Sequence, residues 1–192
     1  TGPERFSYEK PELADANGCS AILSDQNSGL VNRLFGKAVP SYLKLTDDDK
    51  ATLKAFLPAL KNSGIRRLHL SYDGGNDEGF GTFERGEDEN GQLIAVSALL
   101  ENSAFLNEIA PFVTDRYEQN QHPVFRPGAA PDVTRMIGDY LEHELPVILV
   151  SLLLGRGYGT GEYELYGRAV ADLNTMTITD DPQAPYPHGP SN

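Results

Sequence analysis

The densest group of side chains that could bind a ligand lies between residues 73 and 89, where seven acidic residues accompany a single basic residue. Hard cations such as Ca²⁺ prefer several carboxylate and carbonyl oxygens on a flexible loop. The start of this segment could supply such oxygens from Asp73, Asn76, Asp77 and Glu78. The spacing is not that of an EF-hand, because the third loop position is Gly75, which has no side-chain oxygen. A Ca²⁺ or Mg²⁺ site is therefore one hypothesis for this segment; otherwise no cofactor is expected.

The same acidic segment is also typical of a solvated hairpin or of a surface that binds a basic protein. Its Asp, Asn and Gly residues favour turns. Carboxylates on such a turn would steer a positively charged partner toward it. The residues that we expect to bind the partner are Asp73, Asp77, Glu78, Glu87, Asp88 and Glu89.

A second candidate group surrounds His143, which lies between Glu142 and Glu144. Asp139 precedes His143 by four residues, so in a helix the two side chains would share a face and could orient an imidazole or hold a metal. The sequence has no His-Glu-x-x-His motif here, and no second histidine is close by. An exposed helix face is the simpler interpretation.

Glu144 raises a separate question about the same helix. At 100° per residue it falls near the stripe that contains Ile137 and Leu141, so an unbroken helix would turn its carboxylate toward the core. A buried carboxylate needs a partner, or its pKa rises. If Pro146 frays the last turn, Glu144 instead reaches solvent, and this is the interpretation that we prefer.

Recognised catalytic and phosphate-binding signatures are missing from the sequence. The glycine-rich run 155–161 precedes a strand pattern and fits neither GxGxxG nor GxxxxGK[ST], so it predicts a turn. No GxSxG is present. We therefore assign no catalytic residue.

Charge and hydropathy exclude two classes of partner. The 192 residues include 28 acidic and 16 basic ones, which gives a formal net charge of −12. Such a charge argues against direct nucleic-acid binding and against docking on anionic lipid. The longest apolar run, 145–154, is ten residues long, whereas a membrane-spanning helix needs about 20. Cys19 is the only cysteine and no leader pattern is visible, so we expect a cytoplasmic protein.

Periodicity predicts the main elements. Thr46 is expected to cap a helix that Pro58 kinks or divides and that ends at Gly64. Asp132 is expected to cap a second helix, which ends or kinks at Pro146. The remaining expected elements are a strand 65–72, a return strand 80–84, a strand or helix 92–100, a short helix 102–112 and strands from 162 to 179.

These elements predict a single α+β domain over residues 46–181, with a small antiparallel or mixed sheet and two main helices packed on one face. Residues 1–45 are expected to form an irregular arm with one short helix near 28–36, because prolines and glycines interrupt them. Residues 182–192 form a proline-rich tail.

The order of a helix, a strand ending in the sequence YDGGNDEG (72–79), a second helix containing EHELP (142–146), a glycine turn and terminal strands is similar to a family of small bacterial proteins, often carried on plasmids and phages. Those proteins have an acidic turn of the type [FY]-D-G-x-G-D-x-G, and this chain has Asn76 where the family favours Gly. The resemblance covers roughly 46–181 and implies an α+β fold on a mobile genetic element. It implies no activity.

The function that these observations favour is that of an acidic, non-enzymatic interaction protein. It would bind a protein partner through the acidic hairpin and an adjoining apolar surface, and a sharper version is an inhibitor that occupies a basic nucleic-acid-binding groove. One alternative is a divalent-cation-dependent hydrolase that uses the acidic turn. Another is a structural subunit of a larger, phage-like assembly.

Overall fold

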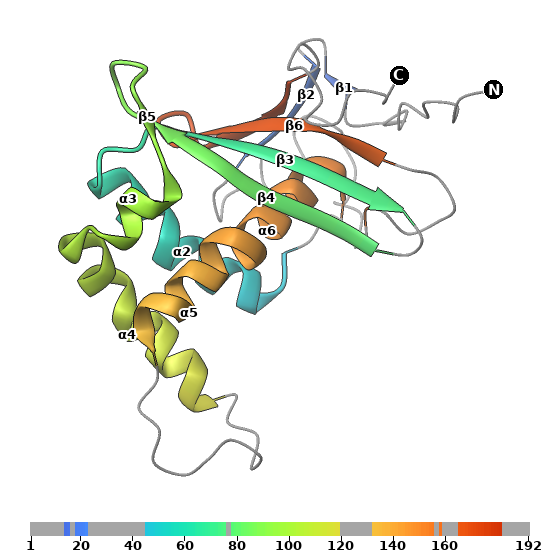
Figure 1. The fold of residues 1–192 in the computed structure, drawn as a ribbon. Coiled ribbons are helices and arrows are strands. Elements are labelled where there is room, and N and C mark those ends of the chain that lie inside the picture. The colour runs from blue at the N-terminus through green and yellow to red at the C-terminus, as the bar shows by residue number, and fades with distance from the viewer. Residues whose placement is uncertain are drawn as a thin grey trace, which may run out of the picture.

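A computed structural model describes residues 14–15, 18–22, 45–75, 78–119, 132–155, 158 and 165–181. The described chain forms an antiparallel sheet with helices packed against it (Figure 1). The expected fold class, α+β with a small sheet, is confirmed.

The sheet has seven strands in the order β1-β2-β7-β6-β3-β4-β5, and every neighbouring pair is antiparallel. The strands are β1 (Ala14–Asp15), β2 (Gly18–Ile22), β3 (Arg67–Gly75), β4 (Glu78–Glu87), β5 (Leu93–Ile94), β6 (Leu165–Asp172) and β7 (Thr177–Asp180). The long strand β3 lies between β4 and β6 and pairs with both along most of its length.

The helices are α2 (Asp47–Asn62), α3 (Val96–Leu100), α4 (Ser103–Gln119), α5 (Val133–Asp139), the π-helical turn η2 (Tyr140–Glu144) and α6 (Leu145–Leu154). The last three follow one another without a break, so they form one long element. In Figure 1 this element runs beneath β4.

Alternation along β3 gives the sheet two different faces. Leu68, Leu70 and Tyr72 are buried, whereas Arg67 and Asp73 are exposed. Successive residues of a strand point to opposite faces, so the buried set defines an inner face and the other set an outer face. The inner face contacts the helices, and the outer face carries the polar side chains.

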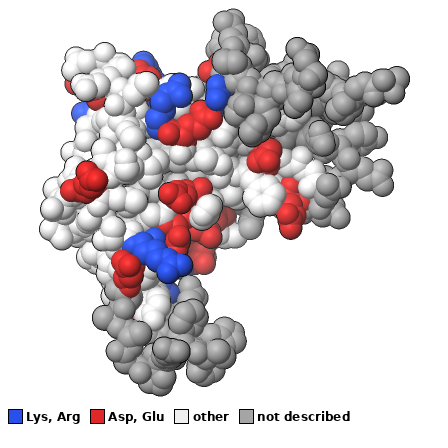
Figure 2. Space-filling model, viewed as in Figure 1, with Lys and Arg blue, Asp and Glu red and all other residues white. Residues whose placement is uncertain are grey.

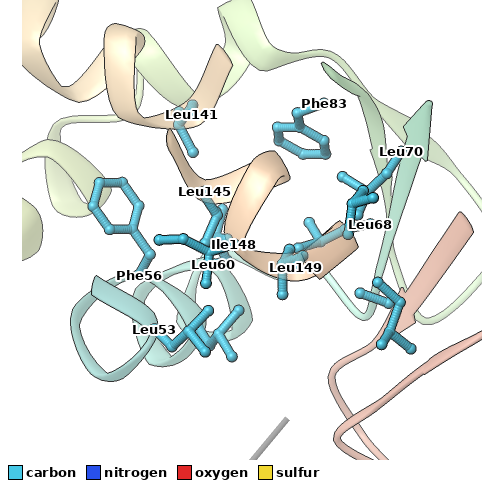
Figure 3. Packing of buried hydrophobic residues seen from close by; sticks show 14 of the residues in the cluster. Leu53, Phe56, Leu60, Leu68, Leu70, Phe83, Leu141, Leu145, Ile148 and Leu149 are labelled. Atoms are coloured by element: carbon cyan, nitrogen blue, oxygen red, sulfur yellow. The ribbon is translucent and has the colours of Figure 1, made fainter. Parts of the chain in front are cut away.

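The core lies between the inner face and the helices. In Figure 3, Leu145 and Leu149 of α6 lie between Leu60 of α2 and Leu68 of β3. Each of these four leucines is at most 1% exposed. Burying a leucine side chain contributes roughly 1.5–3 kcal/mol, so this layer holds the helices onto the sheet.

Helix α2 begins where the sequence predicts. The Thr46 side chain accepts a hydrogen bond from the Asp49 backbone, and the Asp49 carboxylate accepts one from the Thr46 backbone, both at 3.0 Å. Pro58 was expected to kink or divide this helix, and the division is wrong, because α2 continues to Asn62. Pro111 likewise lies inside α4, which was expected to end there. Both prolines are exposed, so water can solvate the carbonyl groups that lose a helical hydrogen bond.

The second predicted helix starts at its expected cap, because the Asp132 side chain accepts a hydrogen bond from the Arg135 backbone. This helix was expected to end or kink at Pro146, and the end is wrong. The helix widens into η2, where the Leu145 N–H bonds to the Tyr140 carbonyl five residues earlier, and then continues as α6. A wider turn makes room for a proline that has no N–H to donate, so the helix passes Pro146 without ending.

The largest differences between the strands of the structure and the sequence prediction concern β4 and β2. The return strand, expected over 80–84, extends over the whole of Glu78–Glu87 as β4. Residues 18–22, expected to belong to an irregular arm, form β2, which pairs with β7. The predicted helix near 28–36 and the tail 182–192 lie outside the described residues.

Candidate interaction surface

The register of β4, β3 and β6 arranges the outer face in rows across three strands. Asp73 pairs with Phe80 on one side and with Tyr166 on the other. Directly paired residues point to the same face, with Cβ atoms about 4.5–5.5 Å apart. We call Phe80, Asp73 and Tyr166 the tip row, because they lie at the end of the β3–β4 hairpin where its strands connect.

All three members of the tip row are exposed. Phe80 and Tyr166 are 51% and 40% exposed, and they are two of the three large hydrophobic side chains exposed in the described part of the chain. Aromatic side chains at the surface are enriched in protein interfaces, where they bury much area. A carboxylate between two such rings combines apolar contact with negative charge.

The Asp73 carboxylate makes no ion pair with any described residue. Its charge acts instead on Tyr158, whose hydroxyl is buried behind the hairpin. Burial first, and then the charge of Asp73, raises the pKa of Tyr158 far above the usual range of a tyrosine. No lysine, arginine or histidine side chain in the described part of the chain therefore neutralises the charge of Asp73.

The middle of the outer face is different, because its acid is paired. Glu84 accepts a hydrogen bond from Arg168 at 3.1 Å across β3, and Arg85 lies 3.8 Å from its other carboxylate oxygen. Glu84 is the extra residue at a bulge in the β3–β4 pairing. Its negative charge is compensated within the sheet.

The far end of the outer face holds a second network. The Glu87 carboxylate bonds His69 Nε2 and Arg67 Nη1, both at 2.7 Å. Arg67 Nε also lies 3.4 Å from Asp172. The bond to His69, followed by the bond and charge of Arg67, outweighs the effect of burial and lowers the pKa of Glu87. The same pairing raises the pKa of Arg67.

The acidic residues predicted to bind a partner do not form one surface. Asp73 and Glu78 lie at the tip, whereas Glu87, Asp88 and Glu89 lie at the other end of β4. Ten residues of strand separate these ends by roughly 30 Å.

Two of the three acidic residues at the far end of β4 are also bonded to other groups of this chain. Glu87 is held by the network with Arg67. Asp88 accepts hydrogen bonds from the backbone N–H groups of Asn90 and Gln92, which shapes the turn before β5. Only Glu89 of these three residues is exposed.

The predicted cation site is only partly described. Asn76 and Asp77 lie outside the described residues, and of its four members only Asp73 and Glu78, both exposed, can be placed. Within the described ranges, no group of three or more His, Cys, Asp or Glu residues is arranged to hold a metal ion.

His143 and Glu144 lie on the exposed side of η2. The His143 side chain is 72% exposed, and its Nε2 is 4.0 Å from the carboxylate of Glu142. Glu144 is exposed, as we expected, but not because the helix frays. The wide π turn changes the phase of the helix, so that Leu145 instead of Glu144 continues the buried stripe of Leu141.

Acidic and basic side chains are mixed over the face that Figure 2 displays, where blue groups lie directly against red ones. The acid surplus is therefore not concentrated into one continuous patch on the described part of this face.

Sequence reasoning found Asp73 but missed its aromatic neighbours. The sequence pattern assigns Phe80 and Tyr166 only to strands. Phe80 is aligned with Asp73 by a hairpin register that a bulge makes hard to predict, and Tyr166 is aligned by a pairing between residues 93 positions apart. One signal was present: Phe80 lies between Gly79 and Gly81, and Tyr166 precedes Gly167. Glycine inside a strand often marks a close approach of another part of the chain, and the residue next to it then points to the opposite face.

Comparisons of the chain with protein-family models, with curated proteins and with solved structures found no match. Among the described residues, no helix is both long and apolar enough to cross a membrane.

Proposed function

We propose that this protein is an interaction module that binds a protein partner with a basic surface through the tip row. The observation that carries this proposal is the position of Asp73, an exposed carboxylate with no ion pair among the described residues, between the exposed rings of Phe80 and Tyr166.

The chemistry of the tip row fits a lysine or arginine side chain. A cation within about 6 Å of an aromatic ring is attracted to the face of that ring. Its charged end would meet the carboxylate of Asp73, and its aliphatic part would cover Phe80 or Tyr166. An arginine suits both contacts, because its planar guanidinium stacks on rings and pairs with carboxylates.

The net charge of −12 would assist the encounter. Long-range attraction raises the association rate of oppositely charged proteins and falls with added salt. The tip row would then provide the short-range contacts that hold the complex.

The narrower version, an inhibitor that occupies a nucleic-acid-binding groove, receives less support. Such an inhibitor needs a series of unpaired carboxylates that resembles a phosphate backbone. On the described outer face, Glu84 and Glu87 are paired with arginines, which leaves only Asp73 and Glu78, both at the tip, without an ion pair and so no long series of free carboxylates. The proposal therefore rests on the Asp73 carboxylate and its two neighbouring rings, and not on a resemblance between the acidic surface and a phosphate backbone.

Photo-crosslinking tests the proposal. p-Benzoylphenylalanine placed at position 80 should crosslink a partner in a lysate of the source cells, and the crosslinked segment of that partner should carry lysine or arginine. The same group at Leu93, which is 58% exposed at the other end of the hairpin, is the matched control and should not give this product.

Charge reversal completes the test. Adding Asp73→Lys to the variant that carries p-benzoylphenylalanine at position 80 should abolish the crosslinked complex. Glu89→Lys in the same variant makes an equal change of charge at an exposed site far from the tip and should preserve the complex. A product of equal yield in both variants, or a crosslinked segment without basic residues, would contradict the proposal.

A further inference from the structure

The outer edge of β4 is largely without a strand partner. On its β3 side, β4 is paired from Glu78 to Glu87. On its other side, β5 pairs only with Gly86 and Glu87. In the described parts of the chain, nothing else forms hydrogen bonds with the backbone of residues 78–85 on that side. An edge strand of this length presents a row of N–H and C=O groups that another strand can use.

We infer that an extended basic segment of the partner adds to the sheet as a new strand along residues 78–85 of β4. This inference rests on the proposed function and specifies the form of the partner. Main-chain hydrogen bonds would provide affinity, and alternate side chains of the added strand would provide specificity, as in other complexes formed by strand addition.

Charge favours a basic partner over a second copy of this chain. Two copies would each carry a net charge of −12. An antiparallel pairing of two β4 strands centred on Gly81 would also place Glu78 of one copy opposite Glu84 of the other. Like charges directly opposite each other destabilise a strand pair.

The geometry of the sheet connects the edge to the tip row. An added strand would lie about 4.8 Å from β4, and so about two strand spacings from β3. A side chain opposite Phe80 on the outer face would point in the same direction as the Phe80 ring. An arginine at that position is long enough to lie across the ring and reach the carboxylate of Asp73. The contact with Asp73 and the pairing with β4 would then form together.

Helix contacts beneath β4 leave the edge in a fixed position. A Cβ on Gly81 would come within 3.0 Å of the Pro146 carbonyl oxygen, so the backbone of β4 rests on the start of α6. A strand held in this way needs little reorganisation to accept a neighbour, which lowers the cost of binding.

A short synthetic peptide provides the test. The probe is an acetylated and amidated peptide of alternating threonine and arginine, seven residues long, and amide hydrogen exchange of residues 78–85 is the measurement. At about 90% occupancy, exchange of the edge amides should slow roughly tenfold, because only the free fraction exchanges. The same peptide with every backbone nitrogen methylated keeps its charge but cannot form the strand, and it should give no protection.

Protein variants separate this inference from the proposed function. Asp73→Asn should lower the affinity of the protein for the unmodified peptide roughly two- to fivefold, as expected for loss of an exposed ion pair. Glu89→Gln should leave that affinity unchanged. If both peptides bind equally and both depend on Asp73, strand addition is overturned while the tip row keeps its proposed function. If neither peptide binds at millimolar concentration, the inference fails, and only the crosslinking experiment bears on the function. If, without peptide, the amides of residues 78–85 exchanged more slowly as the protein concentration rose, the edge would instead pair with a second copy of this chain, and the inference would be overturned.

Discussion

Pro146 lies directly against Gly81, so that a Cβ atom on Gly81 would be 2.8 Å from the Pro146 carbonyl carbon. Both groups belong to the backbone, and neither can rotate away as a flexible side chain could. The contact fixes where the start of α6 crosses beneath β4. Because Gly81 is next to Phe80, this packing also holds the part of β4 that carries Phe80.

Gly81→Ala should therefore destabilise the protein. The new methyl group must push β4 and α6 apart, which costs roughly 1–3 kcal/mol for overpacking in a core. Thr82→Ala, at the neighbouring exposed position on the outer face, is the control and should cost well under about 1 kcal/mol. Urea denaturation followed by circular dichroism measures both. Equal midpoints for Gly81→Ala and wild type would show that the close approach of β4 and α6 is absent in solution.

The phase of the long helix gives a second prediction. Leu141 is fully buried and Glu144 is exposed. Leu141→Ala should cost about 2–5 kcal/mol because it leaves a cavity. Glu144→Leu should change the free energy of unfolding by no more than about 0.5 kcal/mol. If η2 were an ordinary α-helical turn, Glu144 would face the core and its replacement would have a large effect. A large loss of stability for Glu144→Leu would therefore contradict the π turn.

The sequence predicted features that depend on neighbours in the chain. The caps at Thr46 and Asp132 are local, because each side chain bonds a backbone group three residues later. The buried faces of β3 and of the helix around Leu141 follow from periodicity. These patterns are sufficient to predict an α+β fold.

Features that depend on distant contacts were not predictable. The sequence pattern places Gly79 and Gly86 in turns on either side of the return strand expected over 80–84, which makes that strand too short. In the structure both glycines lie within β4, and residues distant in sequence pack where their side chains would be: Tyr158 against Gly79 and Ile65 against Gly86. The tip row was missed for the same reason, since it exists only once β6 pairs with β3.

The exposure of Glu144 was predicted correctly but from the wrong cause. A four-residue repeat such as Ile137, Leu141, Leu145 and Leu149 rotates by roughly 40° at each step in an α-helix. The π turn offsets part of this drift, so that all four side chains remain buried and Glu144 moves out of the stripe. No local pattern in the sequence indicates how a helix will accommodate a proline such as Pro146.

Acid should weaken the protein through Glu87. Its pKa is lowered in the folded state, mainly by the hydrogen bond to His69, relative to about 4.3 in the unfolded chain. A lowered carboxyl pKa contributes stability that is fully present above the unfolded pKa and is lost as pH falls through the folded pKa. Glu87→Gln should therefore lower the melting temperature at pH 6–7, and its difference from wild type should shrink as the pH falls below about 4.

Glu89→Gln is the matched control for this titration, because it removes an exposed carboxylate two residues away. Its melting temperature should follow that of the wild type across the same pH range. If the deficit of Glu87→Gln stayed constant down to pH 3, the pairing of Glu87 with His69 and Arg67 would not contribute to stability.

Two buried tyrosines should respond in opposite directions to the loss of a hydroxyl group. The Tyr158 hydroxyl is buried and has no hydrogen-bond partner among the described residues. The Tyr72 hydroxyl donates to the Asp180 carboxylate at 2.7 Å. Leaving a buried polar group unpaired costs about 1–3 kcal/mol, whereas a hydrogen bond to a charged group contributes about 1.5–3 kcal/mol. Tyr158→Phe should therefore raise the midpoint of urea denaturation, and Tyr72→Phe should lower it.

Each of these two changes removes one oxygen atom, so packing is nearly the same in both variants and the difference in sign reports the hydrogen bond. A lower midpoint for Tyr158→Phe would mean that its hydroxyl has a partner in solution, and the buried side of the hairpin would then need to be reconsidered as a polar site.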